Sequence, residues 1–392
     1  MKKEFMTKLS RLGNLDQESV SPSKVLPIYM NTVFAFDDVE TLDAVYAGEE
    51  KGYVYSRNAN PTTDSLAEMI AAIEEGEAAK VYGSGMAAIT MSIIANVNAG
   101  DHVISDKVLY GGSYQLLNEE LRRFGVEVTF LDFKHDDVEA HIKPNTKLLY
   151  METITNPLME VIDIKKYADI AHKHKALLIV DNTFATPIIC QPLALGADVV
   201  VNSATKYICG HSDVTGGVVV STKEMIDKIH HTAAIYGPSM SPFDAWILMR
   251  SLRTLELRMI QHSKNALELA EFLEEQPQIS KVYYPGLKSS ETHELAKEQF
   301  VNELYGGMLS IDLVGGEKAA YEFIRALENI KFLPSLASFT TSISYPGKTS
   351  HRALTEEERD SAGISMGLIR LSIGLESVSD LKEEFKKALS NL

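Results

Sequence analysis

The stretch ALLIVDNTFATPIICQPLALGADVVVNSATKY, residues 176–207, holds two short apolar runs that each end in polar residues. The first ends at Asp181, and the second leads into Ser203 and Lys206. Near-continuous runs of Val, Ile and Leu are typical of strands that helices cover on both faces. In an open sheet of this kind, ligands bind outside the carboxyl ends of the strands. The stretch therefore predicts an α/β fold with a site near these three residues.

Further apolar runs surround this stretch at the spacing of βα units, at residues 80–83, 102–105, 126–132, 147–152 and 217–221. Helical patterns alternate with them. One of these begins with Asn60 as N-cap and Pro61 at the first helical position, which are strong helix-start signals. We predict a large α/β domain with a mostly parallel sheet over residues 59–257.

The two ends of the chain have sequence patterns that differ from that of the large domain. Residues 1–58 contain prolines and scattered aromatic residues without sustained periodicity, so we predict an arm that packs on another surface. After Ser251 a long amphipathic stretch runs to Leu273, followed by the β-rich runs KVYYPGL, GGMLSIDL and IRLSIGL. This pattern predicts a smaller α+β domain over residues 258–392.

Composition excludes several classes of protein. The 392 residues include 38 Lys plus Arg and 54 Asp plus Glu, for a net charge of −16, without a Lys/Arg-rich run, so nucleic acid is a poor partner. The only two cysteines, Cys190 and Cys209, lack metal-ligand spacing and are expected to be buried thiols. Adjacent His230 and His231 cannot face one ligand on a helix, so we predict no metal. Without a secretory h-region or an apolar run of about 18 residues, we expect a cytoplasmic protein.

The segment GSGMAA, residues 83–88, fits the pattern GxGxxA between a strand and a helix. Backbone N–H groups and the helix dipole at such a turn can hold a phosphate. Three interpretations stay open on the motif alone: a tight turn, a phosphate cradle, and the dinucleotide site of an NAD-dependent dehydrogenase.

Asp181 and Lys206 suggest a more specific chemistry. An unpaired carboxylate at the end of an apolar strand is costly, so Asp181 needs either a cation or a turn to cap, here at Asn182 and Thr183. Lys206 lies in an SxxK pattern, but the companion motifs of serine acyl-transferases are missing. A partly desolvated lysine can instead form a Schiff base. Pyridoxal 5'-phosphate (PLP) is held by such a lysine together with an Asp on its pyridine nitrogen.

The motifs GSGMAA, LYGGS, ETITNP, VDNTFATP and SATKY, in this order, resemble the Cys/Met-metabolism family of PLP-dependent enzymes. The resemblance extends from about Ile28 to Glu376. It implies PLP fold type I, as in aspartate aminotransferase, with the arm lying across a neighbouring subunit of a homo-oligomer, expected to be a homotetramer.

The resemblance also implies roles for individual residues. Lys206 would form the Schiff base, Asp181 would pair with the pyridinium, and Tyr110 would stack on the ring and act as acid or base. The remaining cofactor-binding residues would be Gly85, Met86, Ser203 and Thr205, with Tyr55 and Arg57 reaching the phosphate of a neighbour. The substrate carboxylate would be bound by Asn156, Ser335 and Arg370.

The implied reaction is α,γ-elimination on a sulfur amino acid, as in methionine γ-lyases or cystathionine γ-lyases. Its products would be 2-oxobutanoate, ammonia and a thiol. The alternative is γ-replacement on an O-acyl-homoserine, as in cystathionine γ-synthases and O-acetylhomoserine sulfhydrylases. The two reactions differ only in whether water or another nucleophile captures the intermediate.

Four features depart from familiar members of the family. Gln115 and Pro334 stand where cystathionine enzymes commonly carry Arg and Glu, and Gly112 stands where methionine γ-lyases often have Cys. The segment 335–352 has an unusual middle, in which Pro346-Gly347 is either a turn or a change at the pocket mouth. Without a cation at position 115, a distal carboxylate loses a partner, which favours a methionine-like substrate.

Overall fold

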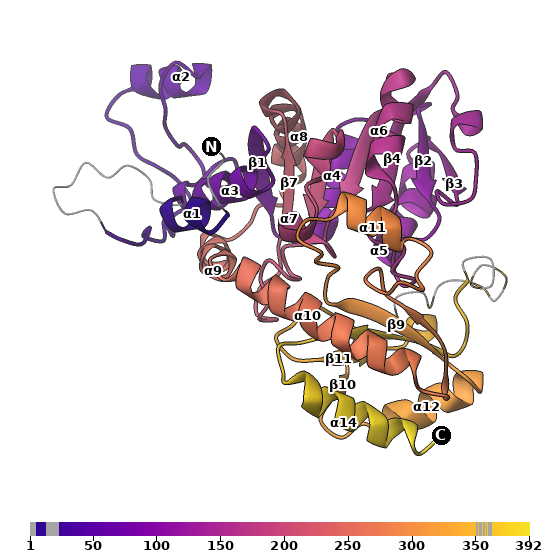
Figure 1. Ribbon diagram of the computed structural model, residues 1–392. Helices are drawn as coiled ribbons and strands as arrows, with labels where there is room; N and C mark the ends of the chain where they lie inside the picture. Colours follow the sequence, from indigo (N-terminus) through magenta and orange to yellow (C-terminus); the bar gives the residue numbers. More distant parts are fainter. Residues whose placement is uncertain are drawn as a thin grey trace.

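The computed structural model describes residues 5–12, 23–349 and 363–392, together with residues 352, 355, 357 and 359. Parts of the predicted arm (1–4 and 13–22) and of the segment 335–352 (350 and 351) lie outside the described residues. The described strands form two sheets, with the larger one above the smaller one in Figure 1.

The larger sheet has the strand order β1-β7-β6-β5-β4-β2-β3. In that order its strands are Ala78–Tyr82, Gly217–Ser221, Val199–Asn202, Leu177–Asp181, Thr146–Glu152, His102–Asp106 and Glu127–Leu131. Each coincides with an apolar run of the sequence, so the predicted mostly parallel sheet is confirmed. The exception is β7, which runs antiparallel to both β1 and β6 and was not predicted to do so.

Helices cover both faces of this sheet. Successive residues of β6 enter opposite cores: Val200 packs with α3 (Pro61–Ile73) and α6 (Ile164–Lys173), while Val199 and Val201 pack with α4 (Gly85–Ile94) and α8 (Lys223–Tyr236). This alternation is the period-2 geometry of a strand. Burial on both faces explains the continuous apolar runs.

Two helix starts were predicted from sequence signals and are confirmed. The Asn60 side chain accepts a hydrogen bond from the Thr62 N–H at the start of α3, with Pro61 at the first helical position. The Ser84 side chain accepts one from the Ala87 N–H and so begins α4 directly after β1. The turn at residues 83–85 therefore joins a strand end to a helix N-terminus.

The smaller sheet has the strand order β10-β11-β12-β9-β8. These strands are Lys331–Phe332, Ser342–Ser344, Leu368–Ser372, Met308–Leu313 and Ile279–Tyr283, and α10 (Leu255–Glu274), α12 (Gly316–Ala326) and α14 (Val378–Leu389) pack in the same region. The two- and three-residue strands β10 and β11 were missed because such short pieces carry no periodicity. The predicted domain boundary at 257/258 falls inside α10, and the division into domains stays a prediction.

The other helices and turns connect these layers. They are α1 (Phe5–Arg11), α2 (Val39–Ala47), α5 (Gly111–Gln115), the π-helix Leu116–Leu121, the 3₁₀ turns Glu139–His141, Pro192–Leu195 and Pro346–Lys348, and the helices α7 (Thr186–Ile189), α9 (Pro242–Leu252) and α11 (His293–Gln299). Within the described residues, no helix has both the length and the apolar character needed to cross a membrane.

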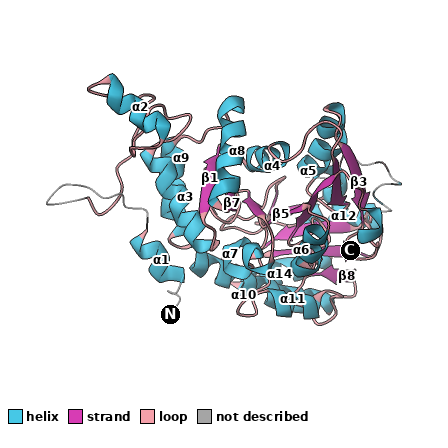
Figure 2. Cartoon of the chain, turned by 90° about the horizontal axis from the view of Figure 1, so that it is seen from above, coloured by secondary structure: helices cyan, strands magenta, loops and turns pink. Residues whose placement is uncertain are grey.

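The arm projects from the side of the molecule. Figures 1 and 2 show α2 standing away from both sheets, and α2 has no buried residue. Several large apolar side chains of the arm are exposed, among them Tyr29, Met30, Val33, Val39 and Tyr46. A segment with so much exposed apolar surface is typical of an interaction site.

Candidate active site

A cavity of about 270 Å³ lies where the strands β4, β5 and β6 end. Ten of the twelve predicted site residues line it: Gly85, Met86, Tyr110, Asn156, Asp181, Ser203, Thr205, Lys206, Ser335 and Arg370. The cavity is also lined by Ser84, Ile89, Glu152, Ile154, Thr183, Phe184, Thr215, Pro334 and Leu336. The structure thus brings together residues separated by nearly 290 positions in the sequence.

Lys206 lies in the turn that follows β6. The turn is closed by hydrogen bonds from the Lys206 N–H to the Ser203 carbonyl at 3.1 Å and from the Gly210 N–H to the Lys206 carbonyl at 2.7 Å. Burial lowers the pKa of the Lys206 ammonium, and the nearby positive charge of Arg370 lowers it further. In the described part of the chain, the ammonium has no salt-bridge partner. A lysine in these surroundings is a better nucleophile and base than one in water.

Asp181 ends β5 and is buried. Its Oδ1 accepts hydrogen bonds from the Thr183 N–H at 3.0 Å and the Thr183 hydroxyl at 2.5 Å, so the turn-capping interpretation holds. The described residues give it no cation to pair with, and burial raises the pKa of this carboxyl group. The Thr183 hydroxyl also accepts from the Ser203 N–H at 2.8 Å, which joins the ends of β5 and β6. Sequence analysis had given Thr183 only a capping role.

The start of α4, the end of β6 and the start of β7 approach one another closely. An added Cβ at Gly85 would lie 2.6 Å from the Ser203 Cβ, and one at Gly217 would lie 2.0 Å from the Ser84 carbonyl oxygen. Only glycine fits at both places. The backbone N–H groups at the α4 N-terminus, with the Ser203 side chain beside them, make a cradle suited to an anion.

Glu152 is a residue whose role sequence analysis missed, although its place at the end of β4 was noticed. It is the register partner of Asp181, so the two carboxyl groups leave neighbouring strands at the same level. Its Oε1 accepts a hydrogen bond from the Tyr110 N–H at 2.7 Å. Burial, and then the charge of Asp181, raise the pKa of Glu152 well above its ordinary value. Glu152 thereby fixes the backbone of Tyr110, whose side chain is 44% exposed.

Asn156 and Arg370 also line the cavity. The Arg370 Nη1 donates to the Asn156 Oδ1 at 2.9 Å, and both side chains are buried. Burial lowers the pKa of the guanidinium to about 10, so it stays charged at neutral pH. Its remaining N–H groups can grip a carboxylate with two parallel hydrogen bonds. Ser335 lines the cavity as well, from the loop after β10.

The chemical groups that line this cavity fit PLP. The cavity combines an amine of lowered pKa, an acid without a cation, and a helix N-terminus with a serine hydroxyl beside it. The predicted Thr205 also lines the cavity, but its hydroxyl accepts the Gly216 N–H at 2.9 Å. The amine can form the Schiff base, the acid can pair with the pyridinium nitrogen, and the helix N-terminus with the serine hydroxyl can hold the phosphate.

Tyr55 and Arg57 do not reach this cavity. Arg57 donates to the Ala234 carbonyl in α8 and lies 5.7 Å from the centre of the Tyr55 ring, and both side chains are exposed. The single chain therefore completes its cavity without these two predicted cofactor-binding residues.

The positions that depart from the family differ in their surroundings. Pro334 lines the cavity, whereas Gln115 is exposed at the end of α5. A Cβ at Gly112 would lie 2.6 Å from the Tyr110 ring and 3.0 Å from the Met86 sulfur. A cysteine at position 112 would therefore displace Tyr110 from its present place.

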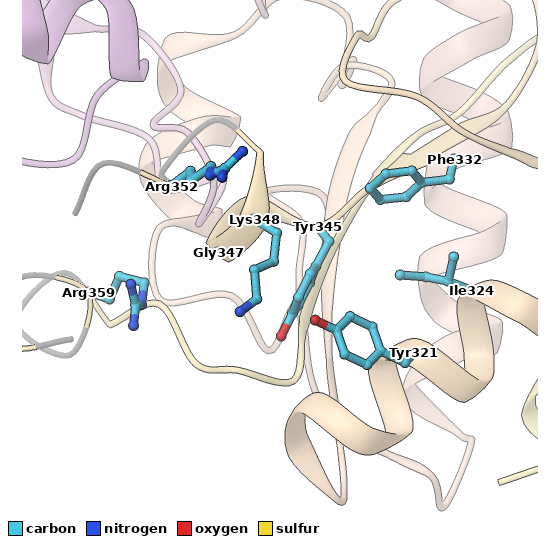
Figure 3. Close-up of a pocket in the computed structure, with 8 residues that line it drawn as sticks. All are labelled: Tyr321, Ile324, Phe332, Tyr345, Gly347, Lys348, Arg352 and Arg359. Carbon is cyan, nitrogen blue, oxygen red and sulfur yellow. The ribbon is translucent and has the colours of Figure 1, made fainter. Parts of the chain in front are cut away.

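Residues Pro346–Lys348 form a 3₁₀ turn, which confirms the turn interpretation. Figure 3 shows Gly347 and Lys348 lining a second cavity of about 610 Å³ next to the aromatic rings of Tyr321 and Tyr345. The cavity that holds Lys206 is reached instead by Ser335 and Leu336. The unusual middle of the segment 335–352 thus contributes to a different surface of the small sheet.

Comparison with known proteins agrees with the site. The family model of the Cys/Met metabolism PLP-dependent enzymes matches residues 7–390. The chain is 45% identical to an L-methionine gamma-lyase of Porphyromonas gingivalis, covering 93% of this chain and 92% of that protein. It is 42% identical to a cystathionine gamma-lyase of Bacillus subtilis, covering 97% and 98%.

A solved structure adds the cofactor. The putative O-acetylhomoserine (thiol)-lyase of Campylobacter jejuni, which contains a pyridoxyl-lysine monophosphate, superposes with a TM-score of 0.93 at 32% identity, covering 99% of this chain and 100% of that one. The matches cover nearly the whole chain and replace the nicotinamide interpretation of residues 83–88. The chain belongs to the Cys/Met-metabolism family of PLP-dependent enzymes, with PLP fold type I.

Proposed function

We propose that this enzyme catalyses α,γ-elimination on a sulfur amino acid, with L-methionine ahead of L-cystathionine. The products are 2-oxobutanoate, ammonia and a thiol. The observation that carries this proposal is the charge of the cavity wall. Lys206 and Arg370 are its only cations among the described lining residues, while Met86, Ile89 and Phe184 are apolar.

The substrate is held at its α-carboxylate. Arg370 is fixed by Asn156 and offers a planar pair of donors to that group, with Ser335 beside it. The side chain of the amino acid then points toward apolar residues. A thioether is stabilised there. The distal carboxylate of cystathionine meets no cation from this chain, so its burial would cost desolvation free energy.

The bound PLP supplies an electron sink for the carbanion chemistry. Lys206 removes the proton from Cα, because burial lowers its pKa and so favours the neutral amine that acts as the base. Asp181 stays ionised when a protonated pyridine nitrogen faces it, which offsets the cost of its burial. Removal of a second proton, from Cβ, lets the Cγ–S bond break, and Tyr110, which lines the cavity, donates a proton to the departing sulfur. Hydrolysis of the remaining four-carbon unit then gives 2-oxobutanoate and ammonia.

The second candidate is γ-replacement on an O-acyl-homoserine. The structural likeness to the putative O-acetylhomoserine (thiol)-lyase supports it, because the two chains share the fold along their entire length. A cavity that suits methionine also accommodates a small homoserine ester. Elimination and replacement then differ in whether the intermediate is hydrolysed at Cα, which gives 2-oxobutanoate and ammonia, or captured at Cγ by an added thiol.

The test is the release of 2-oxobutanoate from L-methionine, L-homocysteine, L-cystathionine and O-acetyl-L-homoserine, the last with and without methanethiol. Release from methionine, with slower release from cystathionine, supports the proposed function. If only the ester is consumed, and the thiol diverts it into a new amino acid, the enzyme is a γ-synthase and the first proposal is wrong.

We further propose a homo-oligomer, expected to be a homotetramer, in which the arm completes the site of a neighbour. The exposed positions of Tyr55 and Arg57 and the unburied α2 support this arrangement. Mixing inactive Lys206→Ala chains with Arg57→Ala chains, at a PLP concentration that leaves the Arg57→Ala enzyme largely empty, tests it, since hybrid oligomers contain one intact site. Recovery of activity supports a shared site, and no recovery after confirmed subunit exchange contradicts it. The cytoplasmic location stays a prediction.

A further inference from the structure

Helix α10 (Leu255–Glu274) carries three buried polar side chains on one face. Arg258, His262 and Asn265 follow one another at steps of four and three residues, which places them in line along the helix. None is more than 6% exposed. Such a row of polar groups inside a core needs partners, because each unpaired buried group is costly. The partners belong to two segments: the turn that carries Lys206 and the chain that follows Arg370.

Arg258 contacts the turn that carries Lys206. Its Nη1 donates to the Tyr207 carbonyl at 2.6 Å, and its Nη2 donates to the Ile208 carbonyl at 3.3 Å and the Ser251 carbonyl at 3.0 Å. In the described part of the chain, Arg258 forms no ion pair with a carboxylate. A buried guanidinium that donates its hydrogen bonds to backbone carbonyls fixes the course of that backbone.

The course of the chain at Gly210 agrees with this contact. Gly210 has φ +72°, and an added Cβ would lie 2.0 Å from the Arg258 Nη1. The guanidinium therefore occupies the space in which any other residue would place its side chain. The turn after Lys206 and the Arg258 side chain fit each other only with glycine at this position.

His262 and Asn265 contact the chain that follows Arg370. The His262 Nδ1 lies 2.7 Å from the Ile373 carbonyl, so this nitrogen carries the proton and donates. The Asn265 Nδ2 donates to the Gly374 carbonyl at 3.0 Å and the Glu376 carbonyl at 2.8 Å. These carbonyls lie directly after β12, the strand on which Arg370 stands.

We propose that this face of α10 is a brace that sets Lys206 and Arg370 at a fixed separation. Arg258 is the positioning residue for the cofactor lysine, and His262 is the positioning residue for the strand that holds the substrate carboxylate. Neither side chain lines the cavity. The part concerning Arg370 rests on the proposed function, whereas the part concerning Lys206 requires only that PLP is bound there.

The first experiment follows the absorbance of the bound PLP against pH in Arg258→Met and Arg258→Lys holoenzymes. Loss of the guanidinium lets the Lys206 turn relax, so Arg258→Met is expected to move the midpoint of the spectral transition by about 0.5 pH unit or more. Arg258→Lys, which keeps one charged donor, is expected to move it less. Lys264→Ala, exposed on the same helix, is the control and keeps the wild-type midpoint.

The second experiment compares His262→Leu with His262→Asn. Leu removes the donor to Ile373, and we expect KM for the amino acid to rise about fivefold with little change in kcat or in the PLP spectrum. The amide nitrogen of Asn occupies nearly the place of the Nδ1. It is therefore expected to restore KM to within about twofold of the wild-type value.

Three results would overturn the brace. These are a folded Arg258→Met enzyme with the wild-type spectral midpoint, an Arg258→Met chain that unfolds while Arg258→Lys keeps that midpoint, and equal KM values for the two His262 variants. The outcome of the absorbance experiment on the Arg258 variants does not depend on the identity of the substrate. A shifted midpoint together with no 2-oxobutanoate release from wild-type enzyme would therefore count against the proposed function alone.

Discussion

The ends of β4–β6 and the arm, residues 23–58, hold their site residues in opposite ways. At the strand ends, Glu152 and Asp181 are buried and fixed by register, backbone donors and the Thr183 hydroxyl. In the arm, Tyr55 and Arg57 are exposed and lie outside the cavity of their own chain. The chain therefore completes its reactive groups by itself, whereas the proposed role of the arm in cofactor binding needs a second copy.

The largest expected effect is at the strand ends. Replacing Lys206 with Ala removes the catalytic base, and turnover is expected to fall by at least about 10³-fold. Product release from L-methionine measures it, with the exposed Lys264→Ala as a matched control. If Lys206→Ala keeps a tenth of the activity, the strand ends do not supply the base and the comparison breaks.

The buried carboxyl group of Glu74, next to the end of β6, predicts a dependence of stability on pH. Glu74, at the end of α3, accepts from the Asn202 Nδ2 at 2.8 Å, while the Glu74 Oε2 and the Asn202 Oδ1 have no hydrogen-bond partner among the described residues. Burial raises the pKa of Glu74 from 4.5 to about 7. Protonated Glu74 is therefore favoured in the folded state, and its contribution to stability, complete below pH 4.5, is lost as pH rises toward 7.

Glu74→Gln mimics the protonated acid at every pH. Relative to this variant, the wild type is expected to lose about 2–3 kcal/mol of unfolding free energy between pH 4.5 and 7.5. Urea unfolding at several pH values measures the difference, and the exposed Glu271→Gln serves as control. A constant difference across this range would show that Glu74 does not change its protonation in the folded enzyme.

The proposed role of the arm in PLP binding is tested by removing the positive charge of Arg57. Arg57→Ala is expected to weaken PLP retention about tenfold, the size of one charge-assisted hydrogen bond to phosphate. Equilibrium dialysis of PLP gives the value. Because Arg57 also donates to the Ala234 carbonyl, thermal unfolding must accompany the measurement. Unchanged PLP affinity in a stable variant would remove the arm from the site.

The smallest effect is expected at the exposed Gln115. Gln115→Arg adds a cation at the end of α5, five residues after Tyr110, and is expected to shift the ratio of kcat/KM for cystathionine over methionine about two- to fivefold. Gln115→Met, of similar length without charge, is the control. An unchanged ratio would mean that position 115 does not face the distal carboxylate.

Sequence and structure agree best where local patterns determine the structure. The seven apolar runs located β1–β7, and the cap residue Asn60 and the GxGxxA segment located two helix starts, because burial and helix-start signals are read within a few residues. The reversal of β7 was missed, since a run of valines has the same pattern in either direction. The role of Glu152 was missed because its partner, the Tyr110 N–H, lies 42 positions away.

The site residues needed a different kind of signal. Burial could be expected for Asp181, but its proximity to Arg370 depends on how two sheets pack, which no local pattern encodes. The ordered motifs of the family supplied that information. What neither source gave is the contact between Arg258 and the Lys206 turn, which becomes visible only when helix α10 is placed.

The reversed direction of β7 limits how this enzyme can be redesigned. Because β7 begins where its neighbours end, Gly217 lies under the start of α4, with no room for even a methyl group. Substitution is thus closed at Gly85, which lines the cavity, and at Gly217. Libraries that seek new substrates have more freedom at Pro334 and Leu336, which line the cavity and have no role in the proposed reaction.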